Sequence, residues 1–341
     1  MSPRNLNKKT FRDLHSFYSG KKVVVTGGAG FIGSYMIPQL LELGAHVTIA
    51  HAFSNGKLKY LKAYRDQIIN KETDLTIYRN CLKVLEHADI VINLAAKNTG
   101  IEYDAGHEHE MFTDNMLLQI QPLKAAAEVG VPYFLQVSSA VVYPRKSGII
   151  RIDDVDGNPE LSKSGYAYAK LMGEKLAMWY AKNTAMKVAI VRPNNAYGPH
   201  DEASIITLHV IPALIKKVLR GDNPVTMFGS GKQKRQFIHA YDFSRALLYV
   251  LSKKASHTPL PINVASEDEY TINEVYKKIG EALGEKRPVV HDLSMPEGPR
   301  RRYLDISELL KIGWRQQVPF DIGMKETVDF MLGLQKKTPH S

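Results

Sequence analysis

The sequence contains one cysteine, Cys81, among its 341 residues. A single thiol forms no internal disulfide and no cysteine-built metal site, so we expect no metal centre and no dependence on an oxidising compartment. No apolar run approaches the roughly 18 residues that cross a membrane. Residues 1–19 are polar and lack the apolar core of a secretory signal. These absences predict a cytoplasmic protein with no membrane partner.

The charge of the chain is unbalanced but not concentrated. Lys and Arg number 45 against 35 Asp and Glu, which gives a formal net charge of +10. The basic residues are spread along the chain, so no nucleic-acid partner is expected. Only 232–235 and 300–302 are dense in basic residues. Because both runs lie in the C-terminal half, they indicate a small polyanionic ligand there; the alternative is a solvated basic face.

The segment 26–33, Thr-Gly-Gly-Ala-Gly-Phe-Ile-Gly, follows the apolar run 23–25 and precedes a helical pattern at 34–43. A strand, a glycine turn and a helix in this order place backbone N–H groups and a positive helix end where a pyrophosphate can bind. Gly27 allows the tight turn, Gly30 lets the phosphates approach the main chain, and Gly33 lets the helix pack closely. The segment therefore predicts a dinucleotide-binding turn.

Predicted strands and helices alternate through the N-terminal half. Apolar runs predict strands at 46–50, 76–78, 89–96, 133–137 and 188–191, and helical patterns occupy 111–129 and 165–182. This alternation predicts an α/β fold, a Rossmann-type doubly wound parallel sheet with ligands at its carboxyl edge.

The length of the chain suggests about two domains. We expect residues 1–20 to form an N-terminal arm and 21–195 the NAD(P)-binding Rossmann domain. The regular alternation fades after His200, so 196–341 is expected to form mainly a smaller C-terminal substrate-binding lobe. Within it, 238–255 is expected to pack back on the Rossmann domain.

The end of the predicted strand 46–50 is unusual for a dinucleotide fold. This point usually carries an acid that bonds the adenosine ribose hydroxyls, but here it is His51. Lys57, Lys59 and Arg65 follow closely, and cations there would suit a 2'-phosphate. The cofactor is therefore expected to be NAD or NADP, with neither excluded.

Three candidate catalytic residues come from two predicted elements at the same sheet edge. Ser139 follows the strand 133–137, and Tyr166 and Lys170 lie one turn apart on the helix 165–182, on one face. A free phenol has a pKa near 10, and a nearby ammonium favours its ionised form. Tyr166 is thus expected to exchange a hydroxyl proton during hydride transfer, while Ser139 bonds the same oxygen.

Together these motifs resemble the extended short-chain dehydrogenase/reductase family, which contains nucleotide-sugar epimerases, dehydratases and reductases. The resemblance spans about 21–331. It is carried by 26–33, 93–96, Asn115, 139–144, 166–170, 192–199, 228–242 and 298–314.

The resemblance implies a nucleotide-diphosphate sugar as substrate and a homodimer formed through the helices 111–129 and 165–182. It implies dinucleotide contacts from Gly27, Gly30, Phe31, Ile32, Gly33, His51, Asn80, Ala95, Ala96, Lys97, Asn115, Tyr166, Lys170 and Pro193. It implies substrate contacts from Val141, Asn195, His209, Lys217, Arg235 and Arg301, with the two arginines gripping the diphosphate.

Several segments are similar to those of GDP-L-fucose synthases, among them 95–97, 198–201 and 209–214. His209 falls where those enzymes keep one epimerisation acid/base residue, but Val141 replaces the cysteine that is the other. Nucleotide-sugar 4,6-dehydratases carry an Asp-Glu pair where this chain has Ala140 and Val141, so dehydration is not expected.

Two enzymatic hypotheses and one of another class follow. The bare set Ser139, Tyr166 and Lys170 is what an NAD(P)-dependent nucleotide-sugar 4-epimerase needs, since hydride leaves C4 and returns to the other face. The fucose-synthase-like segments favour instead an NADPH-dependent 4-keto-sugar reductase. The third hypothesis is a non-catalytic dinucleotide-binding sensor, which the presence of Tyr166 and Lys170 argues against.

Overall fold

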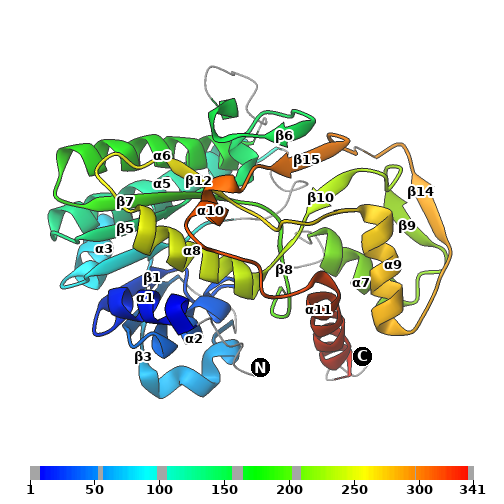
Figure 1. Ribbon diagram of the computed structural model, residues 1–341, viewed down its shortest axis with the longest axis horizontal. Helices are drawn as coiled ribbons and strands as arrows, with labels where there is room; N and C mark the ends of the chain where they lie inside the picture. Colours follow the sequence, from blue (N-terminus) through cyan, green and yellow to red (C-terminus); the bar gives the residue numbers. More distant parts are fainter. Residues whose placement is uncertain are drawn as a thin grey trace.

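The computed structural model describes residues 8–52, 57–97, 106–155, 164–201, 209–295 and 297–336. Its centre is a seven-stranded sheet in the order β12-β7-β5-β4-β1-β2-β3, in which every pair of neighbours is parallel (Figure 1). The strands are β1 (Lys22–Thr26), β2 (His46–His51), β3 (Ile68–Glu72), β4 (Ile90–Asn93), β5 (Tyr133–Val137), β7 (Lys187–Pro193) and β12 (Pro261–Val264). The predicted doubly wound α/β sheet is confirmed.

Helices cover both faces of this sheet (Figure 1). One face carries α3 (Tyr78–Leu85), α5 (Glu108–Glu128) and α6 (Gly165–Asn183); the other carries α1 (Lys8–Tyr18), α2 (Gly33–Glu42) and α8 (Ala240–Lys254). The central strands are apolar and buried on both faces, as parallel strands between two helical layers must be. The 3-10 segments are the eleven-residue η1 (Lys57–Gln67) and the shorter η2 (Ala140–Val142) and η3 (Ile152–Val155).

The strand expected at 76–78 needs correction. Residues 76–78 form no strand, because the Asp74 carboxylate accepts hydrogen bonds from the backbone N–H and hydroxyl of Thr76 and the turn leads into α3. The strand beside β2 is β3, an edge strand that is mostly exposed. Much of the expected N-terminal arm is the helix α1, whose buried Tyr18 donates a hydrogen bond to the Leu248 carbonyl on α8.

The C-terminal half forms a smaller lobe but also contributes β12 to the central sheet and α8 to the helical layer that covers one face of it (Figure 1). Its helices are α7 (Val210–Arg220), α9 (Ile272–Leu283), α10 (Ser307–Lys311) and α11 (Phe320–Gln335). Its small sheets pair β9 (Val225–Phe228) with β14 (Val289–Asp292), β8 (Ala196–Tyr197) with β11 (Ile238–His239), and β13 (Glu269–Thr271), β10 (Lys234–Gln236), β15 (Arg301–Leu304) and β6 (Gly148–Ile150) in that order.

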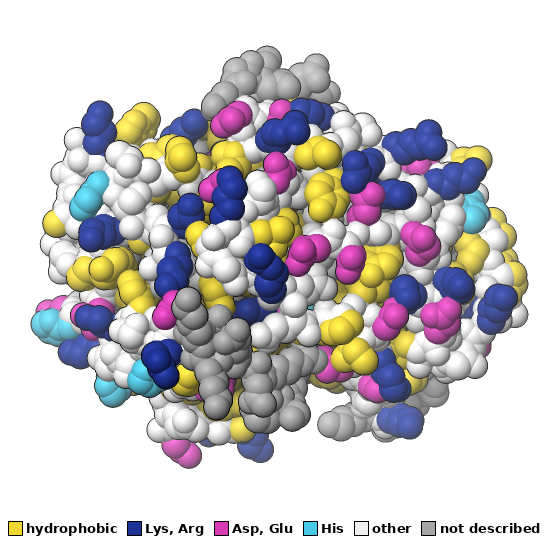
Figure 2. Space-filling model, in the orientation of Figure 1, with side chains coloured by type: hydrophobic (Ala, Val, Ile, Leu, Met, Phe, Trp, Pro, Cys, Tyr) yellow, Lys and Arg dark blue, Asp and Glu magenta, His cyan; other side chains and the backbone are white. Residues whose placement is uncertain are grey.

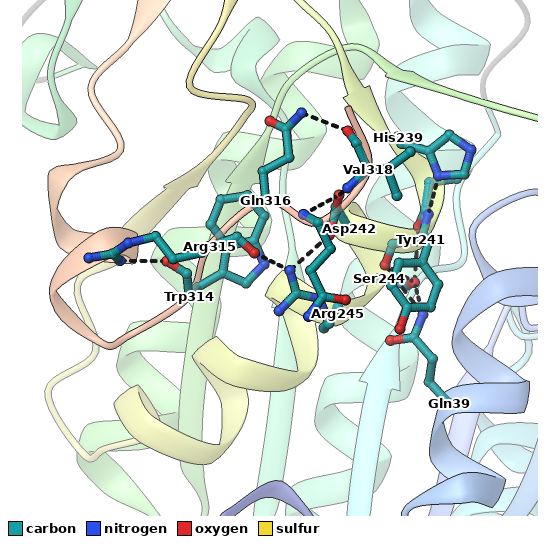
Figure 3. Close-up of polar contacts among 12 residues, drawn as sticks. Gln39, His239, Tyr241, Asp242, Ser244, Arg245, Trp314, Arg315, Gln316 and Val318 are labelled. Carbon is teal, nitrogen blue, oxygen red and sulfur yellow. Dashed lines mark hydrogen bonds and ion pairs between the residues drawn. The ribbon is translucent and has the colours of Figure 1, made fainter. Parts of the chain in front are cut away.

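A buried charge ties the segment before α11 to α8 (Figure 3). The Asp242 carboxylate accepts hydrogen bonds from the backbone N–H groups of Gln317 and Val318 and from the Arg245 guanidinium. Arg245 also donates to the Arg315 carbonyl. Because Asp242 and Arg245 are both almost fully buried, this cluster fixes the C-terminal segment to the layer that covers the central sheet.

Candidate active site

The glycine turn after β1 has the close contacts that the sequence predicted. Gly27 has a φ of +66°, and a Cβ there would lie 3.0 Å from the Ala95 backbone. A Cβ on Gly33 would lie 2.1 Å from the Gly28 carbonyl oxygen. By contrast, a Cβ on Gly30 would meet only the Gly27 carbonyl oxygen. The turn is thus closed on its protein side at Gly27 and Gly33 and open at Gly30, which fits the approach of a dinucleotide phosphate.

The turn after β4 lies beside the glycine turn and is fixed by amide side chains. Thr26 Oγ1 donates to the buried Asn93 Oδ1 at 2.6 Å and accepts from the Ala95 N–H. The Asn115 amide, on α5, bonds both the N–H and the carbonyl of Lys97. Ala96 is exposed between them. Phe31 and Ile32 are half-buried in the neighbouring glycine turn.

His51 ends β2 and is almost fully buried. Its Nε2 lies 2.7 Å from the Asn70 Oδ1 on β3, and its Nδ1 has no partner among the described residues. Asn80 lies further along, in α3, with its amide on the Asp74 carbonyl. Pro193 is the buried last residue of β7. The carboxyl edge therefore presents His51 where an acid is usual, together with an unpartnered buried nitrogen.

Ser139, Tyr166 and Lys170 meet at the carboxyl end of β5. Ser139 caps η2, with its Oγ accepting from the Val141 N–H at 3.3 Å. The Lys170 Nζ donates to the Val137 carbonyl at 2.8 Å and lies 5.7 Å from the centroid of the Tyr166 ring. Gly165 lets α6 start against α5, since a Cβ there would lie 2.0 Å from the Glu108 carbonyl oxygen. The structure brings the three predicted catalytic residues together.

The Lys170 ammonium is buried, and this lowers its pKa. Burial lowers the pKa of Lys170 to about 8, against the opposing effect of the Glu174 carboxylate. The group is therefore mostly charged at neutral pH. A charged ammonium next to a phenol favours the phenolate, so the arrangement suits proton exchange by Tyr166.

Two arginines pair across neighbouring strands of the C-terminal lobe, and one of them reaches the Ser139 turn. Arg302, on β15, donates to the Ala140 carbonyl, and burial and the charge of Arg235 lower its pKa to about 10. Arg235, on β10, donates to the Pro299 carbonyl, and burial lowers its pKa as well. Two partly buried cations, of which Arg235 lowers the pKa of Arg302, suit an anionic ligand such as a diphosphate.

Arg301 is placed differently from the sequence expectation. Its Nε donates to both carboxylate oxygens of Glu269, at 3.0 and 2.8 Å. Neighbouring residues on a strand point to opposite faces, so only one of Arg301 and Arg302 can face the Ser139 turn. The structure brings Arg302 there, a residue that sequence reasoning did not select. Its hydrogen bond to the Ala140 carbonyl identifies it, and no feature of the sequence distinguishes the two neighbouring arginines.

The other predicted substrate residues lie on separate elements. Val141 is half-buried in η2, next to Ser139. The Asn195 amide donates to the Gln236 carbonyl. His209, at the start of α7, is half exposed, and its Nδ1 lies 2.9 Å from the buried Asp201 carboxylate, which raises the pKa of the imidazole. Lys217 lies apart from these, with its Nζ on the Thr226 carbonyl of β9.

The described residues contain no group of three His, Cys, Asp or Glu side chains that could hold a metal ion. Among the helices of the described ranges, none is long and apolar enough to cross a membrane. Cys81 is buried, and its pKa is raised to about 12 by desolvation. Figure 2 shows Lys and Arg side chains scattered over one face of the molecule and interleaved with Asp and Glu.

Comparison with known proteins gives a consistent family. Residues 23–265 match the model of the NAD dependent epimerase/dehydratase family. The chain is 31% identical over 274 residues to GDP-L-colitose synthase of Yersinia pseudotuberculosis, covering 77% of this chain and 88% of that protein. It is 27% identical over 332 residues to GDP-L-fucose synthase of Escherichia coli, covering 94% and 99%. It is 28% identical over 316 residues to dTDP-4-dehydro-6-deoxy-D-allose reductase of Streptomyces bikiniensis, covering 91% and 96%.

Among solved structures, UDP-N-acetylglucosamine 4-epimerase from Methanobrevibacter ruminantium superposes with a TM-score of 0.82 at 25% identity, covering 93% of this chain and 99% of that one. The sequence comparisons and the fold agree with the resemblance to extended short-chain dehydrogenases/reductases and with its fucose-synthase-like segments. The chain belongs to the NAD dependent epimerase/dehydratase family, and it is an NAD(P)-dependent enzyme of the group that contains nucleotide-sugar epimerases and 4-keto-sugar reductases.

Proposed function

We propose that the protein reduces the 4-keto group of a nucleotide-diphosphate sugar. The observation that carries the proposal is the arrangement of Ser139, Tyr166 and the buried Lys170 at the carboxyl end of β5. The nicotinamide cofactor would supply hydride when bound. Tyr166 would give the proton to the oxygen at C4, Ser139 would donate a hydrogen bond to the same oxygen, and Lys170 would stabilise the resulting phenolate.

Two features favour simple reduction over reduction with epimerisation: Val141 and the activity of a relative. The Asp201–His209 pair can exchange protons, because Asp201 holds Nδ1 and leaves Nε2 for a substrate. Inversion of a carbon needs a second proton carrier on the opposite face, however, and Val141 has no proton to exchange. A dTDP-4-dehydro sugar reductase is among the relatives, which supports the same net reaction.

A second candidate, 4-epimerisation, uses the same three residues. It is supported by the close superposition on a UDP-N-acetylglucosamine 4-epimerase. The two candidates differ in the fate of the cofactor, since an epimerase regenerates its NAD in each turnover and a reductase consumes reduced cofactor in proportion to product.

We propose NADPH as the cofactor, with NAD as the alternative. The glycine turn suits either dinucleotide. In place of a ribose-binding acid, β2 ends in His51, whose Nδ1 is unpartnered among the described residues, and Lys59 and Arg65 lie on the adjacent η1. An imidazole and nearby cations suit a 2'-phosphate better than a carboxylate would.

We also propose a cytoplasmic homodimer that pairs through α5 and α6. Four large apolar side chains are exposed on these helices, Phe112, Tyr168, Met172 and Trp179. Their burial against a second copy would remove an exposed apolar surface from water. A cytoplasmic location is supported by the single thiol, which is buried and has no disulfide partner.

The test is to denature the purified protein, identify any released dinucleotide, and then assay GDP-, dTDP- and UDP-linked 4-keto-6-deoxy sugars with NADPH and with NADH. Stoichiometric consumption of NADPH supports the reductase. Tightly bound NAD in near-equal proportion, with interconversion of 4-epimers and no net oxidation, supports the epimerase. Absence of turnover with all these sugars, together with dinucleotide binding, would leave the sensor hypothesis.

A further inference from the structure

A buried ion pair lies one helical turn beyond the Lys170 ammonium. Glu174 and Arg192 are almost completely buried, and the Arg192 Nη2 lies 2.7 Å from the Glu174 Oε2. The Arg192 Nε also donates to both Glu174 oxygens, at 2.9 and 3.2 Å. Such a pair loses the solvation of two charges, and hydrophobic residues of similar volume often stabilise a fold as well or better. A stabilising role alone therefore gives little reason for its presence.

The pair is held in one geometry by groups on three other elements. The Arg192 Nη1 donates to the Ile152 carbonyl at 2.8 Å and to the Tyr143 hydroxyl at 3.1 Å. The Tyr143 hydroxyl donates in turn to the Asn263 Oδ1 on β12, at 2.6 Å. Tyr143 directly follows η2, the turn that Ser139 caps. Each of the three guanidinium nitrogens of Arg192 and each carboxylate oxygen of Glu174 therefore has a hydrogen-bond partner within the protein.

The spacing on α6 places the carboxylate near Lys170. Residues four apart on a helix lie on the same face, and both Lys170 and Glu174 are buried. The buried residues of α5, which packs against α6, include the neutral Met111, Asn115 and Gln119 and no titratable group. The titratable or charged groups near Lys170 in the described residues are Tyr166 and Glu174 on α6 and, beyond Glu174, Arg192 and Tyr143.

We propose that Glu174 is a positioning residue for catalysis, which keeps the Lys170 side chain charged, and that Arg192 holds its carboxylate in place. The proposal rests on the proposed function, because a charged Lys170 matters when Tyr166 exchanges a proton. Burial alone pushes Lys170 towards the neutral amine, and the negative charge of Glu174 opposes this. A lysine with a pKa of about 8 is about nine-tenths charged at pH 7, whereas one with a pKa lower by one unit is about half charged.

The decisive measurement is the pKa of Lys170 itself, followed by NMR in dinucleotide-loaded protein labelled with carbon-13 at the lysine Cε. The resonance is assigned by its loss in Lys170→Arg. Glu174→Gln, which keeps the shape and removes the charge, is expected to lower the Lys170 pKa by about one unit. Glu174→Asp is expected to restore most of the wild-type value.

Tyr143→Phe is the matched control, because it removes a hydroxyl from the same cluster and no charge at neutral pH. It is expected to lower the melting temperature but to leave the Lys170 pKa within a few tenths of wild type. A folded Glu174→Gln protein with an unchanged Lys170 pKa would overturn the proposal and leave Glu174 a structural residue only.

Two further arms keep the result decisive. If Glu174→Gln does not fold, the double variant Glu174→Gln, Arg192→Gln leaves no uncompensated charge. It is expected to lower the Lys170 pKa by a smaller amount, and no change in this variant contradicts the proposal. With an active substrate, the alkaline limb of kcat should move by the same amount as the NMR titration. If no sugar is turned over, the proposed function fails, while the NMR titration still decides the role of Glu174.

Discussion

The glycine turn after β1 and the arginine pair Arg235 and Arg302 are both expected to bind phosphates. The turn would do so with backbone groups, and the arginine pair with charged side chains. The turn uses backbone N–H groups and leaves no room for a side chain at Gly33. The arginine pair uses two long cationic side chains, each held by backbone carbonyls and each with its pKa lowered. A backbone site responds to shape, whereas a side-chain site responds to charge and salt. Substitutions can test this contrast.

The largest effect is expected at Tyr166, the candidate proton donor. Tyr166→Phe removes the proton that the phenol would exchange and keeps the ring above Lys170. We expect kcat to fall by about 10²- to 10⁴-fold, the usual range for loss of a general acid, with cofactor binding changed only a few-fold. Steady-state kinetics and cofactor titration measure both quantities. Unchanged kcat would remove Tyr166 from the mechanism.

The turn should be sensitive to a single methyl group. Gly33→Ala places a Cβ 2.1 Å from the Gly28 carbonyl oxygen, so the turn or α2 must shift. We expect a loss of about 1–3 kcal/mol in the free energy of unfolding and loss of dinucleotide binding. Gly333→Ala, on α11, is the matched control: a Cβ there meets nothing within 4 Å, and alanine favours a helix. Equal denaturation midpoints for the two variants would contradict this account.

The arginine region should respond through substrate affinity and not through folding. Arg302→Ala is expected to raise KM for the nucleotide sugar by about 10- to 100-fold, because hydrogen bonds to charged groups contribute about 1.5–3 kcal/mol. The effect should shrink as salt is added. Arg301→Ala removes the same charge from the neighbouring residue, which is paired with Glu269, and should change KM only about two-fold. A larger effect from Arg301 would restore the sequence-based assignment.

The smallest effect concerns the Asp201–His209 pair, which is half exposed on the histidine side. The carboxylate raises the pKa of His209, so the pair stabilises the fold at low pH and this contribution is lost as pH rises through the folded pKa. Asp201→Asn should therefore lower the melting temperature slightly at pH 6 and by less at pH 9. The His209 pKa, measured by proton NMR, should fall in the variant. A difference that grows with pH would contradict this linkage.

The sequence predicts the buried strands of the central sheet well and its exposed edge poorly. Buried parallel strands are nearly continuous apolar runs, so β1, β4 and β5 are readable from residue type alone. The edge strand β3, Ile-Ile-Asn-Lys-Glu, has little apolar pattern because it is mostly exposed, and Thr76 was mistaken for part of a strand because its turn depends on Asp74.

The sequence also does not determine which way the side chains on short strands point. Arg301 and Arg302 are chemically identical, and only the pairing of β15 with its neighbours decides which one lies near Ala140. Likewise, β12 starts at a proline and has four residues, so its place beside β7 follows from tertiary packing and not from its own pattern.

The addition of β12 to the central sheet has a consequence for synthesis of the protein. Until the ribosome has made residues 261–264, the buried strand β7 is an uncovered edge of apolar side chains and unpaired backbone groups. A nascent chain that ends near residue 195 carries the whole glycine turn and the three candidate catalytic residues but an incomplete sheet. Such a chain is expected to aggregate unless a chaperone covers the edge, and we expect the sheet to be completed only after residues 261–264 have been made.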